Sequence, residues 1–323
     1  MSTLSIGPDA HRYTWDEGWA QLPARHSATG NGRVHGLVAL KDGRLVVFRQ
    51  ASPAVCVLAP DGTLLDEWGL GFTGAHGLSV VDADADDADL AFWLVDQESR
   101  RVVRCGLDGT EQRELAAPAP DRVPGGLYTP TWAVEHPANG DVWVGDGYGG
   151  NCVYRYDSGG DIIQVLDGTG PGEMGRFGEP HGLAISPQNE LWITDRQNHR
   201  VVVYDLDGNF LRGKKDLCHS PCSFAFHDGH VYVPELFGAL KIITPELELV
   251  AELGANPDVQ PRPDGAWWPP VAPEGWPDLA GTAHVQAGRF NSPHGIAVSP
   301  VDGSVYVGEW IVGGRLIRLT PER

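Results

Sequence analysis

The stretch Pro180-His181-Gly182-Leu183-Ala184-Ile185 places a histidine and a glycine directly before an apolar segment. The same pattern recurs at three other places, namely Val34-His35-Gly36-Leu37-Val38-Ala39, Ala75-His76-Gly77-Leu78-Ser79-Val80 and Pro293-His294-Gly295-Ile296-Ala297-Val298. A histidine that returns at one register of a repeated unit predicts imidazoles at equivalent places in the fold. Because neutral imidazole is the commonest metal ligand, this repetition indicates a metal-binding protein.

The register of these histidines anchors a unit that recurs along the chain. The anchor positions, spaced 41, 55, 50, 41 and 72 residues apart, are His35, His76, Thr131, His181, Cys222 and His294. Each anchor is followed by three short β-rich segments, and Asp-Gly pairs such as Asp61-Gly62 mark tight turns into a fourth. Four strands in a unit of about 40–50 residues are typical of a propeller blade. The sequence therefore predicts an all-β, six-bladed β-propeller in which residues 1–323 form a single domain.

The last unit ends after its third apolar segment, at Leu319. Residues 13–19, which precede the first anchor, contain a further segment with aromatic side chains. We expect this N-terminal segment to supply the missing outer strand and to close the ring, so that both termini share one blade.

Two segments interrupt the regular repeat. Residues 81–89 are rich in aspartate and are expected to form either a solvated loop or a cation site. Residues 255–287 are rich in proline and contain Trp267, Trp268 and Trp276. A long insertion inside a regular repeat is usually functional or disordered, and the three tryptophans favour order. We expect a lid beside the central pocket, or else a cover for a sheet edge or an oligomer contact.

The composition limits the partners that the protein can have. Hydrophobic residues make up 41% of the chain, and the net charge of −19 repels the phosphate backbone of nucleic acid. Residues 1–10 lack the features of a secretory signal, and no apolar run is long enough for a membrane span. The five cysteines are odd in number and scattered, which favours free thiols. We expect a cytoplasmic protein that acts on a small molecule, without nucleic-acid or membrane partners, and its oligomeric state is left open.

The position of the histidines in a propeller favours a metal site. The innermost strand of each blade lines the central channel, and His76, His181 and His294 belong to blades two, four and six, about 120° apart. Each His-Gly pair alone is more typical of a turn or core histidine, but three converging imidazoles suit zinc, or another divalent transition metal, with one open position. His35 in blade one is interpreted as an additional ligand, a partner behind the ligands, a substrate contact or a satisfied core histidine.

A second repeated register lies at the end of the second segment of each unit. It is occupied by Arg49, Asp96, Asp146, Asp195, Glu235 and Glu309. An acidic residue there is interpreted as a structural device that bonds neighbouring backbone, with catalysis as the alternative. The residues just beyond this register differ between blades and are expected at one mouth of the channel; they are Gln50, Gln97, Tyr148, Arg196 and Trp310.

Several of these motifs resemble known families. Gly175-Arg176-Phe177-Gly178-Glu179-Pro180-His181 and its counterpart before His294, together with Asp195-Arg196-Gln197-Asn198-His199-Arg200-Val201, look like NHL repeats. A second set of motifs resembles the peptidyl-α-hydroxyglycine α-amidating lyases; it consists of Pro180-His181-Gly182-Leu183-Ala184, Asp195-Arg196-Gln197-Asn198-His199-Arg200, Asp146-Gly147-Tyr148 and Pro293-His294. This resemblance implies a six-bladed propeller with a catalytic zinc on His76, His181 and His294. It further implies that Tyr148 is the general base and that Arg196 binds the substrate. A second substrate-binding arginine of the family falls near Arg49, one residue out of register.

The implied reaction is cleavage of the N–C bond of a carbinolamide without consumption of water. The chain departs from the family pattern at Gly295, where the family has an aspartate that binds calcium, so we do not expect a structural calcium ion. We expect a related lyase that acts on a small hydroxylated amide, ureide or similar compound. The alternatives are a metal-dependent hydrolase or lactonase on a propeller, which would use carboxylate and amide oxygens around calcium, and a non-enzymatic NHL interaction module.

Overall fold

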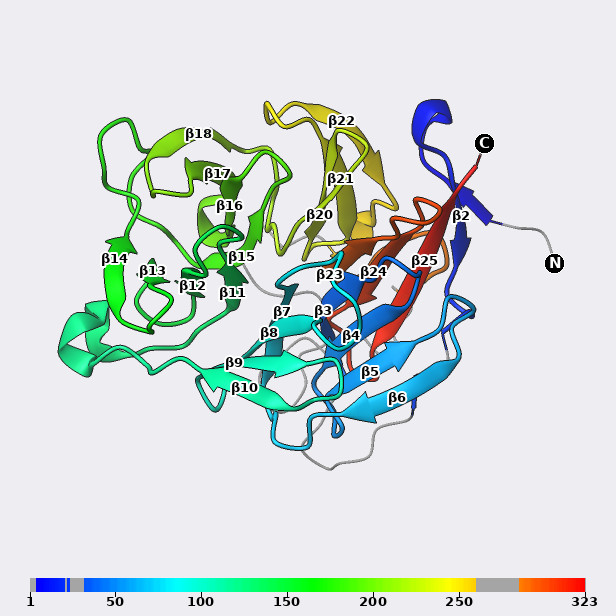
Figure 1. The fold of residues 1–323 in the computed structure, drawn as a ribbon. Coiled ribbons are helices and arrows are strands. Elements are labelled where there is room, and N and C mark those ends of the chain that lie inside the picture. The colour runs from blue at the N-terminus through cyan, green and yellow to red at the C-terminus, as the bar shows by residue number, and fades with distance from the viewer. Residues whose placement is uncertain (1–3, 21, 24–31, 260–284, 323) are drawn as a thin grey trace.

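The computed structural model describes residues 4–20, 22–23, 32–259 and 285–322. In this part of the chain, 25 strands form six antiparallel sheets arranged around a centre (Figure 1). In each sheet the strand that follows the anchor residue is the innermost one, and the innermost strands of most neighbouring sheets contact one another. The predicted six-bladed β-propeller is therefore confirmed.

Each of the first five blades is a four-stranded meander. Blade one contains β3 (Val34–Ala39), β4 (Leu45–Arg49), β5 (Val55–Leu58) and β6 (Leu64–Trp68). Blade two contains β7 (Ala75–Val80), β8 (Ala91–Asp96), β9 (Arg101–Gly106) and β10 (Glu111–Glu114). Blade three contains β11 (Trp132–Glu135), β12 (Val142–Asp146), β13 (Cys152–Tyr156) and β14 (Ile162–Leu166). Blade four contains β15 (Pro180–Ile185), β16 (Glu190–Asp195), β17 (Arg200–Asp205) and β18 (Phe210–Lys215). Blade five contains β19 (Ala225–His227), β20 (His230–Glu235), β21 (Ala239–Ile243) and β22 (Leu249–Leu253).

Blade six joins the two ends of the chain. Its strands are β23 (Pro293–Val298), β24 (Val305–Glu309), β25 (Arg315–Pro321), β2 (Tyr13–Asp16) and β1 (Leu4–Ile6). The N-terminal strand β2 pairs antiparallel with β25, with Trp15 opposite Leu319. The predicted closure by residues 13–19 is thus confirmed, and Figure 1 shows both termini at this blade. The structure adds β1 as a fifth, outermost strand, which the sequence analysis did not predict.

Short 3-10 turns are the helical elements of the described residues: η1 (Asp9–His11), η2 (Pro120–Arg122), η3 (Pro124–Gly126), η4 (Arg196–Asn198) and η5 (Pro257–Val259). Within the described residues, none of these is long and apolar enough to cross a membrane.

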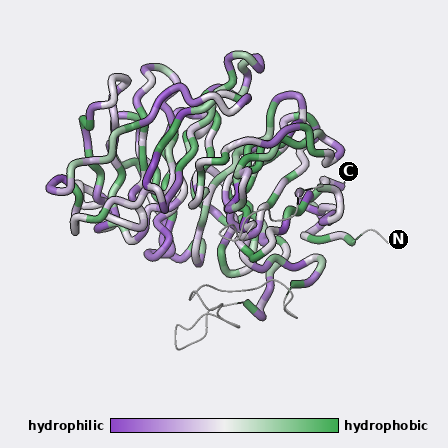
Figure 2. Tube along the Cα trace, turned by 90° about the horizontal axis from the view of Figure 1, so that it is seen from below, coloured by the Kyte–Doolittle hydropathy of each residue, from purple (hydrophilic) through white to green (hydrophobic). Residues whose placement is uncertain are grey.

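Buried hydrophobic side chains fill every interface between adjacent blades. Six separate clusters occur, and each combines residues of two neighbouring blades. In every blade, the residue three positions before the end of the second strand packs in the cluster shared with the next blade. These residues are Val46, Trp93, Trp143, Trp192, Tyr232 and Tyr306. Burial of one such aromatic side chain contributes several kcal/mol at about 25 cal/mol per Å². Figure 2 shows the hydrophobic stretches along the strands and the hydrophilic stretches in many turns.

The acidic residues that end the second strands of blades two to six have the predicted structural role. Asp96, at the end of β8, accepts hydrogen bonds from the backbone N–H groups of Thr73 at 2.6 Å and Gly74 at 2.9 Å, just before β7. The other acidic residues of this register likewise accept a backbone N–H from the segment that leads into the inner strand of their own blade. The carboxylates therefore fix the entry to the inner strands, which carry the anchor residues.

The two predicted irregular segments have different outcomes. Residues 81–89 connect β7 to β8, and their aspartates pair with a hairpin of blade one: Lys41 Nζ lies 2.9 Å from Asp86, and Arg44 Nη2 lies 2.5 Å from Asp87. The loop is largely exposed, and the groups of described residues that could hold a metal lie elsewhere, which favours the solvated-loop interpretation. The lid predicted for residues 255–287 falls largely on residues 260–284, which lie outside the described residues.

Candidate metal centre

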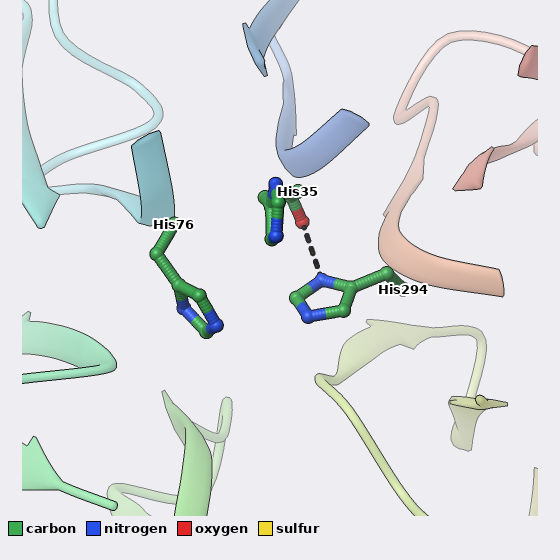
Figure 3. Close-up of side chains that lie close together, drawn as sticks. All are labelled: His35, His76 and His294. Carbon is green, nitrogen blue, oxygen red and sulfur yellow. Dashed lines mark hydrogen bonds between the residues drawn. The ribbon is translucent and has the colours of Figure 1, made fainter. Parts of the chain in front are cut away.

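Four buried histidines meet at the centre of the ring. His35 comes from β3, His76 from β7, His181 from β15 and His294 from β23, and each is at most 2% exposed. The ring centroids of His76, His181 and His294 lie 4.6, 4.8 and 5.1 Å apart in pairs. The ring centroid of His35 lies 5.0 Å from that of His76 and 4.6 Å from that of His294. Figure 3 shows that His35, His76 and His294 extend from separate strands into one space.

The three histidines of alternate blades are held in the same way. Nδ1 of His76 lies 2.7 Å from the carbonyl oxygen of Thr131, and Nδ1 of His181 lies 2.7 Å from that of Cys222. Nδ1 of His294 lies 3.1 Å from the carbonyl oxygen of His35 (Figure 3). A carbonyl oxygen can only accept, so each Nδ1 carries the proton and each neutral ring keeps a lone pair on Nε2. This backbone contact fixes the tautomer of many metal-ligating histidines.

The acceptor carbonyls all belong to the anchor residue of the next blade, and this explains the glycine after each histidine. A Cβ atom on Gly77 would lie 2.5 Å from the Thr131 oxygen, and one on Gly182 would lie 2.2 Å from the Cys222 oxygen. On Gly295 it would lie 2.5 Å from the His35 oxygen. Only glycine lets the neighbouring backbone approach closely enough to accept the Nδ1 proton. The His-Gly motif is thus a device that orients the imidazole.

His35 differs from the other three histidines. Its Nδ1 atom makes no hydrogen bond in the described part of the chain, although the atom is buried. A Cβ atom on the following Gly36 would meet the Cβ of Leu78 at 2.4 Å, and the carbonyl oxygen of His76 lies 3.3 Å away, farther than the acceptor oxygens beside the other three glycines. The tautomer of His35 is therefore not fixed by the device that orients the other three.

Burial keeps all four imidazoles neutral. The pKa of His76 is lowered to about 3, chiefly by desolvation. Desolvation also holds the pKa values of His35, His181 and His294 well below the ordinary value. Neutral imidazole is the form that binds metal ions, so the cluster is ready for a cation at neutral pH.

The Nε2 atoms of His181 and His294 lie 3.2 Å apart. Because both rings carry their proton on Nδ1, two lone pairs face each other in this contact. A cation between the two atoms removes that conflict. Two nitrogens bound to one tetrahedral zinc at about 2.0–2.1 Å would be separated by roughly 3.3 Å, close to the observed separation.

Tyr148 lies between two of the histidines. Its hydroxyl oxygen is 3.1 Å from Nε2 of His76 and 3.0 Å from Nε2 of His181. Nη2 of Arg196 donates a hydrogen bond to the same oxygen at 3.0 Å, and its guanidinium lies 5.3 Å from the centre of the tyrosine ring. Burial raises the pKa of Tyr148, and the positive charge of Arg196 opposes that shift. The hydroxyl is therefore protonated and donates to one of the two imidazoles.

Among the described residues, two overlapping groups that include these histidines could hold a metal. One ligand atom from each of His35, His76 and His294 lies within 4.8 Å of the other two, and the same is true of His181, Cys222 and His294. The predicted ligands His76, His181 and His294 are thus divided between two groups that share His294. Cys222 is at the anchor of blade five, but the sequence analysis did not assign it to the site.

The sequence analysis also missed Glu179, although it directly precedes Pro180-His181. Its carboxylate pairs with Arg196, and both side chains are nearly buried, at 10% and 12% exposure. Glu179 has a φ of +71°, a conformation that few residues other than glycine adopt, and Asn151 Oδ1 accepts its backbone N–H at 2.9 Å. Glu179 therefore positions Arg196 beside Tyr148.

Arg49 has a different environment from Arg196. It lies at the end of β4, and its Nη1 donates to the carbonyl oxygen of Pro23 at 2.8 Å. Among the described residues no hydrogen bond or ion pair joins it to the four histidines. A different arginine, Arg33, is buried near His35, with its guanidinium 4.7 Å from the ring centre of Trp310. The only feature of the sequence that could have indicated a role for Arg33 is its position two residues before the anchor of blade one.

Comparisons with known proteins agree with this architecture. Residues 177–204 match the NHL repeat family. A probable peptidyl-alpha-hydroxyglycine alpha-amidating lyase of Caenorhabditis elegans is 25% identical over 202 residues, which cover 54% of this chain and 55% of that protein. The match thus spans about half the length of that relative. Human NHL repeat-containing protein 3 is 23% identical over 318 residues, which cover 92% of this chain and 81% of the human protein.

The solved structure of a gluconolactonase from Xanthomonas campestris has a TM-score of 0.61 at 15% identity, covering 100% of this chain and 96% of that one. At that identity the likeness shows the fold alone. The fold is that of a six-bladed β-propeller, and the chain contains a match to the NHL repeat. The resemblance to the NHL repeats and to the peptidyl-α-hydroxyglycine α-amidating lyases that the motifs predicted is confirmed.

Proposed function

We propose that this protein is a metal-dependent lyase that cleaves the N–C bond of a carbinolamide, such as a hydroxylated amide, ureide or similar compound. His76, His181 and His294 would hold zinc or another divalent transition metal. One observation carries the proposal: each of these rings donates its Nδ1 proton to a backbone carbonyl, which leaves a lone pair on Nε2 that can bind a metal. The lyase relative supports the reaction class.

The residues of the centre fit such a metal. The donor set consists of neutral imidazoles that are buried and have a fixed tautomer, and two of the Nε2 atoms are already at a separation that suits a shared ion. When bound, the metal would supply Lewis acidity that favours ionisation of the substrate hydroxyl.

Tyr148 is proposed to move the proton. With the metal bound, Tyr148 would react as the phenolate, which the charge of the metal and Nη2 of Arg196, 3.0 Å away, would stabilise; its oxygen would take the proton of the substrate hydroxyl and become a phenol. As the carbinol carbon becomes a carbonyl, the electron pair of the N–C bond passes to the amide nitrogen. Tyr148 then returns the proton to that nitrogen. Water is not consumed, so the reaction is an elimination.

The arginines are proposed to bind an anionic group of the substrate. The charge of Arg196 is balanced by Glu179, so a substrate carboxylate would compete with Glu179 for the guanidinium. Arg49 remains a predicted second contact.

The test combines metal content with turnover. Protein purified without chelator should contain about one equivalent of zinc and should release glyoxylate from an N-acyl-α-hydroxyglycine or an analogous hydroxylated ureide. His181→Ala should lose both the metal and the turnover. The control is His227→Ala, which changes a partly exposed histidine at the end of β19 and should retain both.

The alternatives predict other outcomes. Stoichiometric calcium with lactone hydrolysis would replace the proposal with a hydrolase, because calcium prefers oxygen ligands. Absence of any stoichiometric metal would favour an NHL interaction module. Full turnover in metal-free His181→Ala protein would refute the mechanism.

A further inference from the structure

Cys222 occupies the anchor register of blade five, where blades two, four and six carry histidine. It is fully buried, at 0% exposure. Its sulfur and one ligand atom from each of His181 and His294 lie within 4.8 Å of one another. The thiol makes a long hydrogen bond, 3.5 Å from Sγ to the carbonyl oxygen of Ser220, and it also interacts with the Arg196 guanidinium. A neutral thiol is a weak hydrogen-bonding group, so neither contact prevents it from binding a metal ion.

The backbone of Cys222 already takes part in the centre. Its carbonyl oxygen accepts the Nδ1 proton of His181 at 2.7 Å, so main chain and side chain of one residue lie beside the same imidazole. Ser223, the next residue, donates from Oγ to the carbonyl oxygen of His294 at 2.6 Å. These two bonds tie blade five to blades four and six at the level of the ligands. The sulfur is therefore held at the centre by its neighbours on both sides.

The distances suit a mixed nitrogen and sulfur site. Zinc binds nitrogen at about 2.0–2.1 Å and thiolate sulfur at about 2.3 Å, so a tetrahedral ion separates bound nitrogen and sulfur by roughly 3.6 Å. The 3.2 Å contact between the lone pairs of His181 and His294 points to a cation independently of the cysteine. The sulfur lies within 4.8 Å of one ring nitrogen of each of these two histidines.

We propose that Cys222 is a sulfur ligand of the metal, which it shares with His181 and His294. This inference rests on the proposed metal centre but does not depend on the reaction; with His76, it gives the metal four protein ligands, so a substrate hydroxyl would enter as a fifth. Coordination would convert the thiol to a thiolate and release its proton to solvent. A thiolate selects zinc and related soft ions over magnesium and calcium, and its negative charge offsets part of the charge of the metal.

X-ray absorption at the zinc edge tests the proposal on the intact protein loaded with zinc. The wild-type spectrum should require one sulfur neighbour at about 2.3 Å in addition to nitrogen neighbours at about 2.0–2.1 Å. Cys222→Ser should lose the sulfur neighbour. Its affinity for zinc should fall by at least the roughly 10–100-fold that removal of a residue supporting a metal ligand causes. Cys218→Ser is the matched control, because Cys218 is also buried in the same segment but is absent from the ligand group.

Each outcome has one meaning. Zinc surrounded only by nitrogen and oxygen in the wild-type protein would overturn this inference and leave the proposed metal centre intact. A sulfur neighbour that persists in Cys222→Ser and disappears in Cys218→Ser would also overturn it. Failure of the wild-type protein to bind zinc would overturn the inference, and failure to bind any divalent transition metal would overturn the proposed function as well. Because the wild-type spectrum alone decides between sulfur and no sulfur, the test does not depend on the folding of a variant.

Discussion

Replacement of Gly182 by alanine tests whether the His-Gly motif orients the metal ligands. The new Cβ atom would lie 2.2 Å from the carbonyl oxygen of Cys222 and 2.8 Å from the Cα of Ser223. Both contacts are with backbone, so a flexible side chain cannot relieve them. Blades four and five must move apart by about 1 Å or more to restore an ordinary contact, and this breaks the 2.7 Å hydrogen bond from His181 Nδ1.

The magnitude follows from two costs. Overpacking of a dense core costs about 1–3 kcal/mol, and a buried polar group left without a partner costs about another 1–3 kcal/mol. Gly182→Ala should therefore lower the free energy of unfolding of the metal-free protein by roughly 2–6 kcal/mol. Since His181 also loses its orientation, zinc affinity should fall about 10–100-fold.

Urea unfolding and competition with a zinc chelator measure the two effects. The matched control is Gly71→Ala, because Gly71 is exposed and a Cβ atom there would meet nothing within 4 Å. The control should change the free energy of unfolding by less than about 0.5 kcal/mol. If Gly182→Ala matched this control in stability and bound zinc as tightly as the wild type, the explanation of the motif would be wrong.

Three further predictions concern the histidines, the tyrosine and the acidic register. The pKa of His76 is about 3 in the folded protein and about 6.5 in the unfolded chain. As the pH falls below 6.5, the unfolded state therefore takes up more protons than the folded state. Metal-free protein should therefore lose up to about 1.4 kcal/mol of stability per pH unit from this residue between pH 6.5 and 3, and urea titrations at several pH values should show a smaller slope for His76→Gln. Tyr148→Phe should keep its zinc in metal analysis but lower kcat about 10²–10⁴-fold, whereas unchanged turnover would exclude Tyr148 as the group that moves the proton. Asp96→Ala should lower the free energy of unfolding by at least about 3 kcal/mol in urea titrations, because four backbone N–H groups lose their acceptor, and a loss below 1 kcal/mol would contradict the structural role of this register.

The sequence predicted the propeller because its signals are local. Alternation of apolar residues, turn residues and the spacing of the anchors each depend on a few neighbouring positions. The closure by β2 followed from counting strands in the last unit. By contrast, strand counting does not predict β1, because a blade is complete with four strands. Its pairing with β2 was found only in the structure.

The contents of the centre were predicted in part. The register of the anchors was sufficient to expect His76, His181 and His294 near one another, because equivalent positions of a repeat face the same axis. Tyr148 and Arg196 lie beside them, while Arg49 occupies the register of the acidic residues and contacts Pro23. A shift of one residue along a strand turns a side chain to the other face, so resemblance to a motif that is out of register does not fix the position of a side chain.

What the sequence alone determined is therefore the set of groups that can reach the centre, since periodicity assigns each residue to a strand and a face. Only the tertiary structure decided how these groups meet. The carbonyl oxygens that orient the imidazoles, the sulfur of Cys222 and the carboxylate of Glu179 act across contacts between residues far apart in the chain. Such contacts depend on the rotation and spacing of adjacent blades, which are set by the packing of six hydrophobic interfaces together rather than by any one segment.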